Sequence, residues 1–164
     1  MGTRNLHFAH GREMSRFLNL LKVTPYGDGQ NWCLLEDFSF ERGAEGSGLI
    51  ITVPKLFITD FASVPRAFWN VIPPWGKYGF AAVIHDYLYY DQTLPKKDAD
   101  EILMDGMEVL GVGTVERDII YEAVSKAGQA AWDENTKKKA TGFIRIADEL
   151  PRSVLTTAFY WTGK

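Results

Sequence analysis

Residues 81–89 read AAVIHDYLY, an almost wholly apolar run that holds a histidine followed directly by an aspartate. The run predicts a buried helix, and titratable groups in such a helix cost free energy unless they are paired or bound. His85 and Asp86 are therefore candidates for a functional site, with a purely structural role as the alternative. On a helix, His85 and Tyr89 share a face, whereas Asp86 points about 100° away.

The following segment supplies another polar candidate, Asp100. Helical periodicity over residues 97–110 places Asp100 at the edge of a face rich in leucine and methionine. Because the turn at residues 91–95 is short, the two helices are expected to be antiparallel neighbours. Asp100 is then able to orient His85, as the third group does in a nucleophile–base arrangement. The alternative is an aspartate that stabilises only the first turn of its helix.

The first half of the chain has a strand-like pattern. Short apolar segments alternate with glycine-rich turns, which predicts strands at residues 32–35, 38–40, 49–53 and 55–59. Residues 14–21 are expected to form a short amphipathic helix.

Helical periodicity takes over after Pro73-Pro74. It predicts helices over residues 78–89, 97–110 and 115–132, with a charged linker at 133–139. The predicted fold is therefore α+β, with an N-terminal antiparallel β-meander packed against about three C-terminal helices. We expect one domain over residues 1–135 and a C-terminal extension over 136–164.

Composition and charge exclude several classes of protein. The chain has 164 residues, of which 46% are hydrophobic and 24% charged, as in an ordinary globular domain. A net charge of −3 argues against a nucleic-acid-binding protein. The single cysteine, Cys33, excludes internal disulfides and a cysteine-based zinc cluster. Neither a signal peptide nor a membrane span is expected, because no apolar run is long enough.

A further motif, TDFASVPR at residues 59–66, follows a predicted strand and has the chemistry of a turn. Asp60 would lie over the helix that carries His85, as a metal ligand or an acid. Ser63 and Arg66 are candidate binding residues, and Ser63 is also considered as a nucleophile. No Gly-x-Ser-x-Gly elbow surrounds Ser63, so turn formation is its alternative role.

Three motifs in order resemble the DUF1353 family: residues 56–66, residues 82–89 and Ala99-Asp100. The resemblance covers about residues 49–132. These are small proteins of unassigned function found widely in bacteriophages and prophages. The resemblance therefore implies a location in a phage virion or the host cytoplasm, with other phage structural proteins as partners. Phe61 departs from the family's Thr-Asp-Gly-Ala-Ser pattern, in which glycine is usual at this position.

The pattern His85-Asp86-x-x-Tyr89 also resembles the His-Asp-x-x-Tyr helix of secreted phospholipases A2. That resemblance implies that His85 is the base, Asp86 a calcium ligand, Tyr89 a supporting hydroxyl and Asp100 the group that orients the histidine. Carboxylate donors without thiolates favour a hard divalent cation, so Ca²⁺ or Mg²⁺ is the expected cofactor.

Two functions remain open from the sequence. In the first, Asp60, His85, Asp86 and Asp100 form a hydrolase-like site in which His85 activates water against an ester, amide or phosphodiester. In the second, the protein is a non-catalytic virion component (a tail, connector or adaptor protein). The His–Asp cluster is then a buried polar network that fixes the packing of the helices.

The C-terminal extension ends in three aromatic residues, Phe159, Tyr160 and Trp161. Aromatic anchors of this kind are favoured at protein interfaces. We expect the extension to dock onto another chain, within a phage assembly. The alternative is that it covers the sheet of its own domain.

Overall fold

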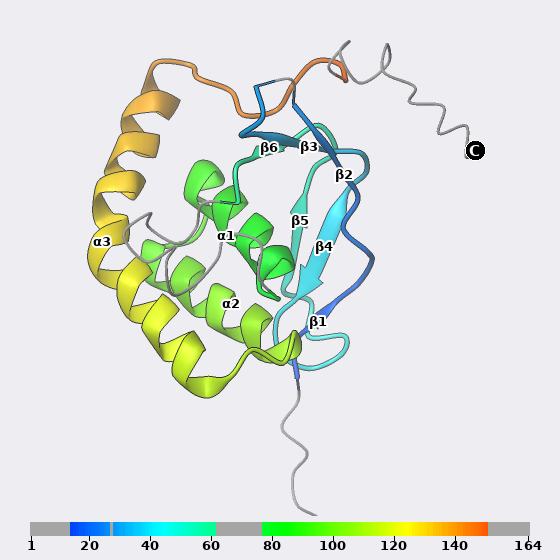
Figure 1. Ribbon diagram of the computed structural model, residues 1–164, viewed down its shortest axis with the longest axis vertical. Coiled ribbons are helices and arrows are strands. Elements are labelled where there is room, and N and C mark those ends of the chain that lie inside the picture. Colours follow the sequence, from blue (N-terminus) through cyan, green and yellow to red (C-terminus); the bar gives the residue numbers. More distant parts are fainter. Residues whose placement is uncertain (1–13, 27, 62–76, 151–164) are drawn as a thin grey trace, which may run out of the picture.

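The computed structural model describes residues 14–26, 28–61 and 77–150, and Figure 1 shows their arrangement. Within these ranges six short strands precede three helices. The strands are β1 (Arg16–Phe17), β2 (Val23–Pro25), β3 (Trp32–Leu34), β4 (Phe38–Glu41), β5 (Ile50–Val53) and β6 (Ile58–Thr59). The helices are α1 (Gly79–Asp91), α2 (Lys96–Val109) and α3 (Thr114–Ala140). The predicted α+β class is confirmed.

The strands form two separate antiparallel sheets and not one meander. One sheet has the order β1-β4-β5 and the other β2-β3-β6. In the first sheet Phe38 lies opposite Val53 and Phe40 opposite Ile51. All four of these side chains are buried, so β4 and β5 present one apolar face to the helices.

The prediction of a helix over residues 14–21 is wrong, because this segment contains β1. Arg16 lies opposite Glu41, and its Nε donates a 2.9 Å hydrogen bond to the Glu41 carboxylate. The Phe17 ring packs against the rings of Phe38 and Phe40, with centroids 5.6 and 4.9 Å apart. A segment this short has little intrinsic helix stability, so burial of Phe17 decides its conformation.

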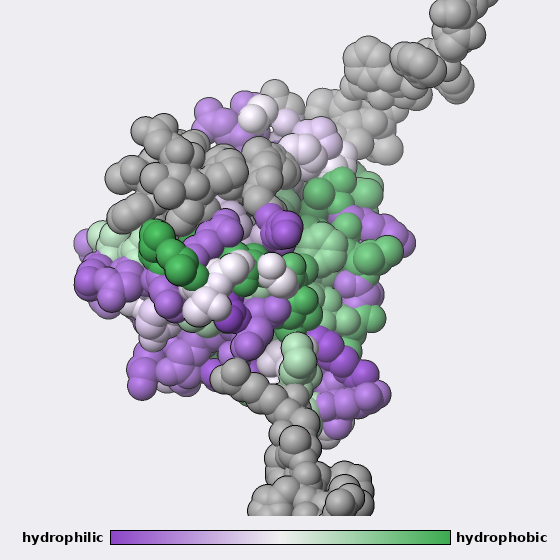
Figure 2. All heavy atoms as spheres, turned by 60° about the horizontal axis from the view of Figure 1, so that its bottom comes forward, coloured by the Kyte–Doolittle hydropathy of each residue, from purple (hydrophilic) through white to green (hydrophobic). Residues whose placement is uncertain are grey.

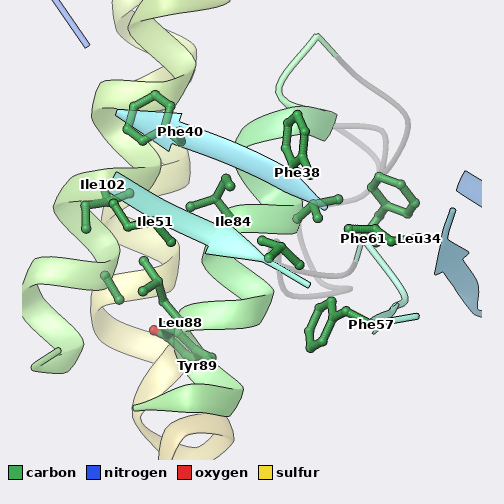
Figure 3. Packing of buried hydrophobic residues seen from close by; sticks show 13 residues of the cluster. Leu34, Phe38, Phe40, Ile51, Phe57, Phe61, Ile84, Leu88, Tyr89 and Ile102 are labelled. Carbon is green, nitrogen blue, oxygen red and sulfur yellow. The ribbon is translucent and has the colours of Figure 1, made fainter. Parts of the chain in front are cut away.

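Helix α1 lies between the strands and α3 (Figure 1) and forms the centre of the core. Figure 3 shows Ile84 and Leu88 of α1 facing β4 and β5, with Ile102 of α2 close to Ile51. Burying an aliphatic side chain of this size contributes about 1.5–3 kcal/mol. The helix that carries His85 is thereby fixed on several sides.

Helices α1 and α2 approach closely at Gly106. A Cβ atom at this position would lie 2.8 Å from the Cβ of Ala81. The absence of a side chain therefore lets the two helices touch, and it sets how deeply α2 sits against α1.

Residues 133–139, predicted as a linker, belong to the last turns of α3. Pairs four residues apart support the helix here: Gln129 donates to Asp133 (2.8 Å) and Lys138 lies 3.7 Å from Glu134. Lysines also favour the C-terminal end of a helix because its dipole is negative there. The charge run is thus a solvated helical face.

Beyond α3 the chain crosses to the second sheet (Figure 1). The N–H of Ile58 donates to the carbonyl of Arg145 (2.8 Å), and the N–H of Ala147 donates to that of Leu56 (3.0 Å). Residues 145–147 therefore lie antiparallel to residues 56–58. The aromatic residues Phe159, Tyr160 and Trp161 fall outside the described residues.

Hydrophobic and hydrophilic residues are unevenly distributed over the surface. Figure 2 shows most of the green, hydrophobic surface of this face on the right, the side on which β4 and β5 lie in Figure 1. Leu49 and Ile50, at the start of β5, are exposed apolar residues. None of the helices described is long and apolar enough to cross a membrane.

Candidate functional site

Helices α1 and α2 bring His85 and Asp100 into direct contact. The Nε2 atom of His85 lies 3.0 Å from Oδ1 of Asp100, and both side chains are almost fully buried. An ionised carboxylate only accepts hydrogen bonds, so we infer that Nε2 carries the proton and that Nδ1 is the acceptor. Within the described residues Nδ1 has no hydrogen-bond partner. The orientation of His85 is set by Asp100.

Asp100 accepts two further hydrogen bonds. The hydroxyl of Tyr89 donates to Oδ1 (2.8 Å), and Nζ of Lys96 donates to Oδ2 (2.7 Å). Burial raises the pKa of the Asp100 carboxyl, but the hydrogen bonds from His85, Lys96 and Tyr89 together outweigh it. The pKa therefore lies below its ordinary value of 3.8. Asp100 is ionised at neutral pH.

Tyr89 remains a protonated donor. Burial and the hydrogen bond to Asp100 both raise the pKa of its hydroxyl far above the ordinary value of 10.0. Its ring packs against the His85 ring, with centroids 4.2 Å apart, and edge-on against Trp132 of α3. Tyr89 thus holds both the carboxylate and the imidazole in place.

Lys96 extends this network to the third helix. Its ammonium group also donates to the backbone carbonyls of Val124 (3.1 Å) and Ser125 (3.3 Å) on α3. The network of His85, Tyr89, Lys96 and Asp100 therefore joins all three helices. Sequence reasoning missed Lys96, although its position four residues before Asp100 on one helix is a signal for an ion pair.

A cavity of about 360 Å³ adjoins the network. Among the described residues, its polar lining comes from α1, the end of α3 and the segments that follow β6 and α3, and its apolar lining comes from small residues of α3. The polar residues are Asp60, His85, Asp86, Tyr89, Asn135 and Arg145, and those of α3 include Ala127, Gly128, Ala130 and Ala131. The structure therefore brings four predicted site residues to one cavity, with Asp100 bonded directly to His85 and Tyr89.

Asp86 and Asp60 line the cavity in different ways. The Asp86 side chain is buried, and its Oδ2 accepts a 2.6 Å hydrogen bond from the Thr59 hydroxyl. The same hydroxyl oxygen accepts the N–H of Phe61 (3.2 Å). The Asp60 side chain is 46% exposed, so it lies where solvent reaches the cavity.

Phe61 has a backbone φ of 54°, in the left-handed region that favours glycine. This is the position at which the resembling family usually has glycine. The loop thus adopts a glycine-like conformation with a phenylalanine in it. Phe61 is buried, and its ring packs edge-on against Trp32 with centroids 6.2 Å apart. The packing of this ring offsets the strain of the backbone, which is about 1–2 kcal/mol.

Arg145 is a second functional candidate, after Lys96, that sequence reasoning did not single out. Its Nε donates to the carbonyl of Ile58 (3.1 Å), its guanidinium lies over the Phe57 ring at 5.3 Å, and its Nη2 is 3.9 Å from Oδ1 of Asp60. It reaches the cavity because residues 145–147 pair with residues 56–58. The apolar–polar–apolar order of Ile144, Arg145 and Ile146 was the available signal for a strand-like segment there.

Among the described residues, no three His, Cys, Asp or Glu side chains are grouped as ligands for a metal ion. The assignment of Asp86 as a cation ligand stays a prediction. Ser63 and Arg66 lie outside the described residues.

Comparison with known proteins gives the family. A family model described as "Protein of unknown function (DUF1353)" matches residues 32–124. The chain belongs to the DUF1353 family. The match begins at β3, earlier than the expected start near residue 49, so β3 and β4 are part of the DUF1353 region. It also includes His85, Tyr89, Lys96 and Asp100, whereas Asn135 and Arg145 lie beyond it.

One relative of this DUF1353 protein is "Uncharacterized protein y4jT" of Sinorhizobium fredii (strain NBRC 101917 / NGR234). It is 35% identical over 133 residues, which cover 76% of this chain. The chain spans only 38% of the length of that relative. No solved structure matches the chain significantly.

Proposed function

We propose that this DUF1353 protein is a hydrolase in which His85 is the general base and Asp100 its orienting partner. One observation carries the proposal: a buried histidine that lines a cavity has one ring nitrogen fixed by an ionised aspartate. A fixed tautomer with a free acceptor nitrogen is the arrangement that general-base catalysis requires. The substrate class is an ester, an amide or a phosphodiester.

In the proposed reaction His85 takes a proton from water and later gives it to the leaving group. Nδ1 of His85 takes a proton from water while the water oxygen attacks the carbonyl carbon or the phosphorus. The positive imidazolium is stabilised by the negative Asp100, whose own position is fixed by Tyr89 and Lys96. The leaving oxygen or nitrogen then takes the proton from Nδ1, which restores the neutral histidine. The exposed Asp60 is a second candidate acid at the cavity.

A phage setting, within or alongside the virion, belongs to this proposal and rests on the sequence resemblance. The competing function is a non-catalytic virion protein in which the same residues only hold the helices together. The cavity beside His85 favours catalysis, because a purely structural network needs no adjoining space.

Chromogenic substrates of the three bond classes test the proposal. The full-length protein is assayed with p-nitrophenyl acetate, a peptide p-nitroanilide and bis(p-nitrophenyl) phosphate. We expect turnover of one class, reduced roughly 10²–10⁴-fold by His85→Gln. Asp100→Asn should also lower the rate, because it removes the group that orients His85. The matched control is Asp98→Asn, on the same helix but not in the network, which should leave the rate unchanged.

The structural alternative makes the opposite prediction. If wild-type protein turns over none of the substrates and His85→Gln melts far below it, the network is structural. Mass spectrometry of purified phage particles then provides the second measurement. A virion component should be present in them in fixed stoichiometry.

A further inference from the structure

We propose that Arg145 makes the cavity a binding site for an anionic group of the ligand, either a carboxylate or a phosphate. The inference deepens the proposed function, on which it rests, by naming a substrate class. The substrate would carry its negative charge next to the bond that is hydrolysed.

The first argument is the state of the Arg145 guanidinium. Its Nε is used by the Ile58 carbonyl, whereas Nη2 is 3.9 Å from Asp60, beyond hydrogen-bond length. Within the described part of the chain neither Nη1 nor Nη2 donates a hydrogen bond. The side chain is only 18% exposed, yet neither Nη atom is among the buried, unpaired atoms of the described residues, so both reach solvent or the cavity. A ligand oxygen in the cavity would accept a charge-assisted hydrogen bond from them.

The second argument is that the guanidinium is held rigidly. The hydrogen bond to Ile58, the contact with the Phe57 ring and the pairing of residues 145–147 with residues 56–58 fix its position. A planar fork held in this way matches the two oxygens of a carboxylate or phosphate, and little side-chain entropy is lost on binding.

The other charges of the cavity decide how strongly an anion binds. The Asp86 carboxylate is buried and accepts a hydrogen bond from Thr59, whereas Asp60 is half-exposed and forms an ion pair with Arg145 at 3.9 Å. An incoming anion therefore competes with Asp60 for the guanidinium. Removing the charge of Asp60 should strengthen anion binding, and removing that of Arg145 should weaken it.

The test is an NMR titration of the full-length, ¹⁵N-labelled protein with inorganic phosphate and, separately, with acetate. The Nε–H signal of Arg145 and the backbone signal of Ile58 are followed. We expect saturable shifts that weaken at least tenfold in Arg145→Gln and strengthen in Asp60→Asn. Tighter binding of phosphate than of acetate assigns a phosphate ester, and the reverse assigns a carboxylate.

Three variants keep the result interpretable. Arg145→Lys keeps the charge without the fork and should bind with intermediate affinity. Arg16→Gln removes an arginine of β1, at the other end of the molecule (Figure 1), and should bind as the wild type does. His85→Gln should lose hydrolysis and keep anion binding, which separates failure of the proposed function from failure of this inference. The inference is overturned if folded wild type shows no saturable shift, or if Arg145→Gln binds as tightly as wild type.

Discussion

Asp100 is the residue on which the buried network depends, since it is the acceptor for three side chains. Replacing it by Asn removes its charge and leaves the ammonium of Lys96, which is 13% exposed, without a counterion. We expect Asp100→Asn to lower the free energy of unfolding by about 3 kcal/mol. Urea denaturation measures the change, with Asp98→Asn as the control. A loss below about 1 kcal/mol for Asp100→Asn would show that the network contributes little to stability.

The pKa of Asp100 also predicts how stability depends on pH. Its folded value lies below the ordinary 3.8, so the ionised carboxylate stabilises the fold above that pH. This contribution is lost as the pH falls through the folded value. The wild type should therefore lose more stability than Asp100→Asn between about pH 5 and pH 2, because the amide does not titrate. Urea unfolding at several pH values checks this, and parallel curves for the two proteins would contradict it.

At the scale of the element, Gly128 allows α3 to sit close to Tyr89. A Cβ there would lie 2.5 Å from the Tyr89 hydroxyl oxygen and 3.4 Å from Cε of Lys96. Alanine ordinarily stabilises a helix by about 1 kcal/mol relative to glycine. Overpacking costs about 1–3 kcal/mol, so we expect Gly128→Ala to destabilise the protein by about 1 kcal/mol net.

A double-mutant cycle separates the clash from other effects of Gly128→Ala. Tyr89→Phe removes the hydroxyl that the new methyl group would meet, so Gly128→Ala should cost less in that background. Gln129→Ala, exposed on the same helix, should change stability by less than about 0.5 kcal/mol. Equal costs in the two backgrounds would show that the hydroxyl is not the obstacle.

Local periodicity was enough to predict α1 and α2 and the meeting of His85 with Asp100. Helix α1 is apolar and buried on almost every side, α2 has one clear apolar face, and the turn between them is too short for any arrangement but a hairpin. The division of the strands into two sheets depends on which strands pair, and short strands carry little register information. Arg145 was missed for a related reason: it reaches the cavity through backbone pairing with residues 56–58, far away in the sequence.

At the scale of the whole molecule, two truncations separate the roles of the C-terminal extension. Deleting residues 141–164 removes Arg145, the packing of Ile146 and the backbone bonds to Leu56 and Ile58. These losses sum to roughly 3–5 kcal/mol, which should lower Tm by about 10 °C. Differential scanning calorimetry measures the shift. An unchanged Tm would contradict the view that the pairing of residues 145–147 with residues 56–58 stabilises the fold.

The shorter deletion, residues 151–164, leaves the pairing with residues 56–58 in place. We expect this protein to fold with nearly the wild-type Tm. If the aromatic residues 159–161 dock onto another chain, as the sequence predicts, the shortened protein should also fail to assemble, which size-exclusion chromatography with light scattering detects. A shortened protein that aggregates would instead show that these residues belong to the core of their own domain.

The hydrogen bond between Arg145 and Ile58 joins residues 87 positions apart in the chain. At ordinary rates of synthesis, roughly 4–17 s pass after the ribosome has added Ile58 before it adds Arg145. During that time one edge of β6 has no partner, and an unpaired edge is open to strands of other chains. The nascent protein thus has an interval in which a chaperone or a neighbouring copy can occupy the place of its own last segment. Overproduction raises the concentration of such intermediates. We therefore expect misassembly through this edge when the protein is overproduced.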